Sequence, residues 1–71
     1  MELEDVFRSQ QRGIYAYFSR TLGDRHAAEE LTPETFYRAC VAALGFRGDS
    51  SVRTWLFGIA RKVLLGAGSP A

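Results

Sequence analysis

The feature that most constrains the fold is a helical spacing of apolar residues, interrupted twice by glycine-containing turns. The three helical stretches cover residues 3–22, 25–44 and 52–65. Apolar residues recur every three or four positions in each stretch, and none shows the alternation of a strand. Because such a stripe buries one face of a helix against its neighbours, we predict an all-α fold, a small three-helix bundle.

Residues with strong positional preferences mark the ends of these helices. Gly23 is suited to end the first helix, and Asp24 is suited to cap the N-terminus of the second. Ser50 or Ser51 would cap the third helix after a loop over residues 45–51. The domain is expected to cover residues 1–65, with Gly66 as the final cap and a flexible tail over residues 66–71.

Pro33 lies inside the second stretch, where it conflicts with a regular helix. A proline in a helix interior removes a hydrogen bond and clashes with the preceding turn, at a cost of about 3 kcal/mol. Thr32 is a good N-cap, and proline is favourable at the first helical position. We therefore predict a short turn over residues 25–31, a kink at Thr32-Pro33 and a main helix over 33–44. A continuous but bent helix is the alternative.

Composition excludes several functional classes. The apolar fraction of 46% is typical of a folded domain. No apolar run approaches the roughly 20 residues that span a bilayer, and the acidic N-terminus is unlike a signal peptide. We expect a cytoplasmic protein with no membrane partner. The single cysteine, Cys40, is expected to be a half-buried apolar residue, since the chain has no Cys/His cluster at metal-binding spacing.

No combination of residues suggests catalysis. The single histidine, His26, lies among acidic residues at a helix start, which indicates a solvated surface side chain. Ser50 and Ser51 have no histidine nearby, and their loop lacks the lysine and the preceding strand of a phosphate-binding loop. We therefore expect no enzyme activity, no catalytic residue, no metal and no cofactor.

Charge is distributed unevenly along the chain. Residues 1–44 carry five arginines against seven acids, and residues 45–71 carry four cations against one acid. The first part thus has a net charge of −2 and the second a net charge of +3. This asymmetry predicts two surfaces with different partners, of which the basic one suits a polyanion.

Two blocks of the sequence resemble region two of bacterial sigma factors, in the extracytoplasmic-function (ECF) class. The blocks are ELTPETFYRAC at 30–40 and FRGDSSVRTWLFGIARKV at 46–63, and the preceding run GDRHAAEEL at 23–31 also fits. The resemblance extends over residues 4–64. It departs from the usual family pattern at Pro33, Gly58 and Lys62, where the family usually has glutamine, arginine and asparagine.

The resemblance implies a promoter-recognition subunit of RNA polymerase that binds and helps to melt the −10 element. The second helix would dock on the clamp coiled coil of the largest polymerase subunit through Glu30, Pro33, Glu34, Tyr37 and Arg38. The loop and third helix would hold the non-template strand as single-stranded DNA, with one base in a loop pocket. The implied DNA-binding residues are Phe46, Arg47, Asp49, Ser50, Ser51, Arg53, Trp55, Phe57, Arg61 and Lys62.

The residues themselves leave some of these roles open. Short polar groups on a tight turn suit the recognition of a splayed base, and cations suit phosphates. Trp55 lies on an apolar stripe and either packs in the core or faces DNA, and Phe46 either anchors the loop or stacks on a base. Asp49 and Ser50 either cap the third helix or contact the base.

Two other interpretations follow from the departures. Nothing after Val63 could form the domain that binds the −35 element, so the chain is either an isolated domain of a longer protein or a shortened relative with reduced activity. Pro33 cannot supply the hydrogen bonds of a glutamine side chain, which would weaken polymerase docking. The alternative functions are a module bound by an anti-sigma factor and a three-helix domain that has lost the family function.

Overall fold

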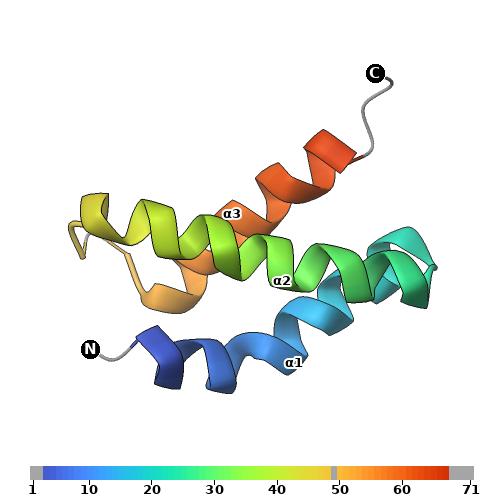
Figure 1. The fold of residues 1–71 in the computed structure, drawn as a ribbon, viewed down its shortest axis with the longest axis horizontal. Coiled ribbons are helices and arrows are strands. Elements are labelled where there is room, and N and C mark those ends of the chain that lie inside the picture. Colours follow the sequence, from blue (N-terminus) through green and yellow to red (C-terminus); the bar gives the residue numbers. More distant parts are fainter. Residues whose placement is uncertain (1–2, 49, 68–71) are drawn as a thin grey trace.

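The computed structural model describes residues 3–48 and 50–67, and this part of the chain contains helices and no strand. The elements are α1 (Leu3–Leu22), α2 (Arg25–Ala42), the short 3-10 helix η1 (Ala43–Gly45) and α3 (Val52–Ala67). Helices α1 and α2 run antiparallel, and α3 crosses behind α2 in the view of Figure 1. The predicted all-α three-helix fold is confirmed.

The core is small and draws on all three helices. Its buried apolar residues are Ile14, Phe18, Ala28, Ala39, Leu56, Ala60 and Val63. Helix α2 contributes Ala28 and Ala39 to this set, and its Thr32 and Thr35 are buried as well. Half-buried aromatic pairs close the edges, with ring centroids 4.7 Å apart for Phe7 and Phe36 and 5.6 Å apart for Tyr17 and Phe57. Full burial of one large side chain stabilises the fold by about 1.5–3 kcal/mol.

Helix α2 is continuous through Pro33, so the predicted helix start at Thr32-Pro33 is wrong and the alternative of one helix holds. Thr32 is not a cap: its hydroxyl donates to the Ala28 carbonyl at 2.7 Å. Buried residues lie on both sides of the proline, from Ala28 to Ala39, and their packing opposes a break. Because Pro33 is exposed, the missing N–H lies on the solvent side of the helix.

The turn between α1 and α2 forms as the sequence predicts. Gly23 has a φ of 63°, and its N–H donates to the Ser19 carbonyl at 2.9 Å. The Asp24 carboxylate accepts from the backbone N–H groups of His26 and Ala27 at 2.9 and 3.2 Å. This N-cap satisfies two of the donors that a helix start leaves unpaired.

The ends of the other helices differ from the expectation. Helix α2 ends at Ala42, and η1 replaces the last turn predicted up to residue 44. Helix α3 continues through Gly66 to Ala67, so Gly66 is not a cap. The remainder of the expected tail, residues 68–71, lies outside the described residues.

Candidate functional site

The segment that links η1 to α3 is held at its start by a backbone hydrogen bond and turns at a glycine. Phe46 has an extended backbone, and its N–H donates to the Ala43 carbonyl at 3.1 Å. Gly48 has a φ of 79°, a left-handed conformation that glycine adopts without strain. Asp49, which the sequence assigned to DNA binding, lies outside the described residues.

A pocket opens beside this turn, with an aromatic pair as one wall. The rings of Phe46 and Trp55 lie 4.8 Å apart at an angle of 33°. Gly45, Arg47 and Ser50 complete a pocket of about 210 Å³, called the loop pocket below. Both aromatic residues are half-buried, so each packs against the protein and also presents ring surface to the pocket. The structure thus shows that Phe46 and Trp55 pack against the protein, and their contact with DNA stays a prediction.

Serine side chains have separate tasks at the start of α3. Ser51 is the N-cap: its hydroxyl accepts from the Thr54 N–H at 3.1 Å and donates to the Thr54 hydroxyl at 2.9 Å. Ser50 donates to the Ser51 carbonyl at 3.3 Å, a long bond, and lines the loop pocket. Ser50 is thus the serine placed for a ligand in the pocket, because it lines the pocket and its hydroxyl oxygen accepts none of the described hydrogen bonds.

The four cations after residue 44 lack acidic partners in the part of the chain that the structure describes. Arg47, Arg53, Arg61 and Lys62 are exposed, and no described carboxylate lies within 4.0 Å of their charged groups. The Arg53 guanidinium lies 5.6 Å from the centroid of the Phe57 ring. An unpaired cation at a surface retains its full capacity to attract an anion.

These cations do not form one row along α3. At 3.6 residues per turn, Lys62 shares a flank with Trp55 and Ile59, and Arg61 lies on the opposite flank with Arg53 and Phe57. The contacts agree, since Lys62 and Ile59 line a groove against α2 and Phe57 packs edge-on against Tyr17 of α1. Phe57 is half-buried by this packing, which fixes its ring.

The five residues assigned to polymerase docking are all exposed on α2, and four of them line two different grooves. Pro33 lines a groove of about 500 Å³ against α1, together with Arg8, Arg12 and Tyr15. The side chains on the other flank, Glu34, Tyr37 and Arg38, line a groove of about 440 Å³ against α3, called the α2–α3 groove below. Glu30 lies near the helix start, 3.7 Å from His26.

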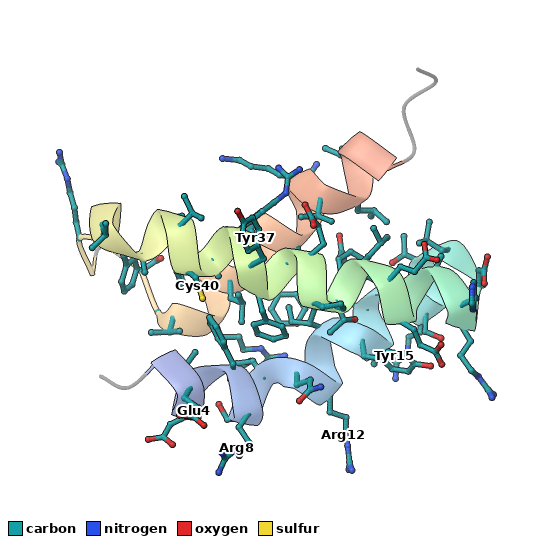
Figure 2. The ribbon with its side chains drawn as sticks, viewed as in Figure 1. Glu4, Arg8, Arg12, Tyr15, Tyr37 and Cys40 are labelled. Carbon is teal, nitrogen blue, oxygen red and sulfur yellow. The ribbon has the colours of Figure 1, made fainter. Side chains whose placement is uncertain are left out.

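The outer side of α2 is more apolar than the sequence analysis assumed. Tyr37 and Val41 are exposed by 67% and 66%, and Leu44 beyond the helix is exposed by 97%. The spacing of Tyr37, Val41 and Leu44 is visible in the sequence and places them on one side of a helix. The spacing does not tell whether that side is buried or exposed. Cys40 was expected to be half-buried and is exposed, a correction that follows from its place beside this outer line. Figure 2 shows Tyr37 and Cys40 on α2, where both side chains are exposed.

The outward side of α1 carries a separate charged row. Arg8 donates to Glu4 at 3.3 Å, and both side chains are exposed at the outer edge of α1 (Figure 2). Within residues 3–48 and 50–67, no group of histidine, cysteine and acidic side chains could hold a metal ion. None of the described helices is long and apolar enough to cross a membrane.

Comparison with known families decides what this arrangement belongs to. The family model described as sigma-70 region 2 matches residues 6–66. The chain belongs to the sigma-70 region 2 family. The resemblance drawn from the two sequence blocks is thereby confirmed, and the expectation of a non-enzymatic protein agrees with the family.

Relatives of this region 2 domain carry sigma factor names. It is 35% identical over 63 residues to the RNA polymerase sigma factor YlaC of Bacillus subtilis, and 46% identical over 57 residues to the ECF RNA polymerase sigma factor SigG of Mycobacterium tuberculosis. A probable RNA polymerase sigma-C factor of Mycobacterium bovis is 40% identical over 62 residues. The matches cover 89%, 80% and 87% of this chain.

The same matches cover only part of each relative. The chain spans 36% of YlaC, 15% of SigG and 33% of the sigma-C factor. The similarity therefore concerns a region 2 domain and not the whole relatives. No solved structure matches the chain significantly.

Proposed function

We propose that this region 2 domain recognises promoters for bacterial RNA polymerase in the cytoplasm, by holding one base of the melted −10 element in the loop pocket. The observation that carries the proposal is the pocket walled by Phe46 and Trp55, which the exposed cation of Arg47 also lines. The aromatic wall can stack on the flat face of any base, and such stacking contributes about 1–3 kcal/mol per base. Ser50 supplies a hydroxyl for the edge of the base.

Melting of the promoter follows from the same geometry. A base reaches the loop pocket only after it leaves the duplex stack, which costs a few kcal/mol. Contacts in the pocket exist only with the open strand, so binding there shifts the equilibrium towards open DNA. Arg47, Arg53 and Arg61 would hold the backbone of the strand through its phosphates.

The polymerase partner would bind the outer side of α2. Its exposed line of Tyr37, Val41 and Leu44 is an apolar surface of the kind that protein partners cover, and Glu30 and Glu34 add acidic groups beside it. We assign this surface to the clamp coiled coil of the largest polymerase subunit. An anti-sigma factor that competes for the surface would act as a regulator, because the two proteins could not bind at the same time.

The test is a titration of single-stranded DNA with the 71-residue chain. A fluorescein-labelled oligonucleotide, selected from a pool with six randomised positions, is titrated at two salt concentrations, with a scrambled strand as the control. We expect the selected strand to bind more tightly than the scrambled one at both salt concentrations. Both affinities should fall as salt rises, because cations that release counterions carry part of the binding energy.

Two results would contradict the proposal. Equal and salt-independent binding of selected and scrambled strands would exclude recognition of a base in the loop pocket. Failure of the selection to enrich any sequence would lead to the same conclusion. Docking on polymerase is tested separately, by pull-down with the isolated clamp coiled coil, so that the two halves of the proposal stand or fall independently.

A further inference from the structure

Two hollows between α1 and α2 join into one elongated groove, called the α1–α2 groove below. Their volumes are about 500 and 300 Å³, and both are lined by Gln11, Thr32 and Pro33. The α1–α2 groove shares no lining residue with the α2–α3 groove. Of the residues assigned to polymerase docking, only Pro33 lines it. It is therefore a surface beside the proposed polymerase surface and separate from the loop pocket.

The two ends of the α1–α2 groove differ in chemistry. At one end, Phe7 and Phe36 are half-buried, with ring centroids 4.7 Å apart, and form an apolar wall. At the other end, Arg8, Arg12 and Tyr15 follow one another along α1 (Figure 2). Phe7 and Tyr15 are eight positions apart, which is about 12 Å at 1.5 Å per residue. This length matches about four residues of an extended peptide.

The charges of the α1–α2 groove favour one or two carboxylates over a polyanion. Arg12 is exposed and has no described carboxylate within 4.0 Å. Arg8 already contacts Glu4 at 3.3 Å, and Glu29 lines the groove with a negative charge. These two carboxylates repel a strand that carries a charge at every nucleotide. A single aspartate or glutamate can pair with Arg12 and accept from the Tyr15 hydroxyl at the same end.

Pro33 leaves a hydrogen-bond acceptor beside the groove. A proline has no N–H to donate to the carbonyl four residues earlier, so the Glu29 carbonyl lacks the partner that a regular helix supplies. Glu29 and Pro33 both line the groove. A peptide backbone carries N–H donors for such a carbonyl, whereas a sugar–phosphate backbone of DNA carries none. The acceptor therefore also favours a peptide as the occupant.

We propose that the α1–α2 groove binds an acidic, amphipathic peptide segment of a partner protein. An apolar side chain of the segment occupies the end at Phe7 and Phe36, and a carboxylate about four residues away pairs with Arg12. None of these residues was assigned to DNA, so binding of the segment does not require capture of a base in the loop pocket.

The test selects octapeptides from a displayed random library against the 71-residue chain. An enriched peptide is labelled with fluorescein and titrated with the chain in solution. We expect enriched peptides to combine an aspartate or glutamate with an aromatic or aliphatic residue about four positions away. Replacement of the acidic residue by its amide should weaken binding about two- to fivefold. Replacement of the apolar residue by serine should weaken it about tenfold, because its burial is lost.

Variants of the chain locate the peptide in the groove. Arg12→Gln should bind the peptide about two- to fivefold more weakly, and the amide replacement in the peptide should then have no further effect. Pro33→Ala should also weaken binding, because its N–H occupies the Glu29 carbonyl. Arg20→Gln is the matched control and should bind normally. Arg20 is an exposed arginine of the same helix, about 12 Å along it from Arg12, and lines neither hollow.

The outcomes separate this inference from the proposed function. Failure to enrich any peptide, or equal affinities of Arg12→Gln and the unmodified chain, would overturn the inference and leave the proposed function standing. Displacement of the peptide by a single-stranded oligonucleotide would show that the groove holds nucleic acid, which also overturns it. If the chain binds the peptide as expected and binds no oligonucleotide, the inference holds and the proposed function fails. Circular dichroism of each variant confirms that the helices are retained.

Discussion

At the scale of single residues, the site is divided between side chains that the fold already uses and side chains that it leaves available. Ser51 is engaged as the cap of α3, and Phe57 is fixed against Tyr17. Ser50 and Arg61 have weaker or no described partners. Sequence analysis grouped all four as DNA-binding, because residue type and spacing do not reveal which hydroxyl closes a cap or which ring contacts a neighbouring helix.

Ser50 and Arg61 should therefore contribute to DNA binding in different ways. We expect Ser50→Ala to reduce the preference for the selected strand over the scrambled strand more than it reduces total affinity, because the hydroxyl contacts a base. Arg61→Ala should reduce affinity for both strands equally and lower the salt slope, because it contacts a phosphate. Titrations of both strands check this, and a loss of sequence preference in Arg61→Ala would contradict it.

At the scale of elements, sequence rules located α1 and the turn after it but misjudged α2. The range of α1 and the roles of Gly23 and Asp24 agree with the prediction, because caps depend on local hydrogen bonds. The break at Pro33 was wrong, because burial of α2 on both sides of the proline is a tertiary effect that local propensity does not contain. The division of α2 between two grooves likewise depends on how α1 and α3 pack around it.

The cap at Asp24 should matter to the stability of the whole domain. Asp24→Ala removes the acceptor for the N–H groups of His26 and Ala27 and should lower the free energy of unfolding by about 1 kcal/mol. For a domain of this size the melting temperature should fall by about 4–8 °C. Thermal denaturation measures this, with Asp24→Ser as the control that retains an acceptor. Equal melting temperatures for Asp24→Ala and the unmodified chain would exclude the cap as a stabilising contact.

Pro33 gives a prediction that separates helix stability from partner contact. Alanine or glutamine at this position restores the N–H that can donate to the Glu29 carbonyl, so both variants should raise the free energy of unfolding, by up to about 3 kcal/mol. Only Pro33→Gln adds the side-chain hydrogen bonds expected at the polymerase surface. Pro33→Gln should therefore strengthen pull-down with the isolated clamp coiled coil, and Pro33→Ala should not. No gain with Pro33→Gln would show that the proline does not impair docking.

At the scale of the whole molecule, the helices arrange two surfaces around a small core. The outer side of α2 is apolar and acidic, and the turn with the flanks of α3 is cationic. The charge asymmetry along the sequence predicted this division of charge. The family resemblance implied a pocket in the loop, but the pattern of residues did not predict that the rings of Phe46 and Trp55 meet to form its wall.

Trp55 is the single tryptophan of the chain and lines the loop pocket, so its fluorescence reports directly on whether a base enters. The most direct measurement is a titration of unlabelled selected oligonucleotide, with Trp55 emission recorded beside the anisotropy of a labelled copy of the strand. We predict saturable quenching of Trp55 with the same midpoint as the anisotropy change, because a base stacks against the ring. Binding that changes the anisotropy and leaves Trp55 emission unaltered would contradict the capture of a base in the loop pocket.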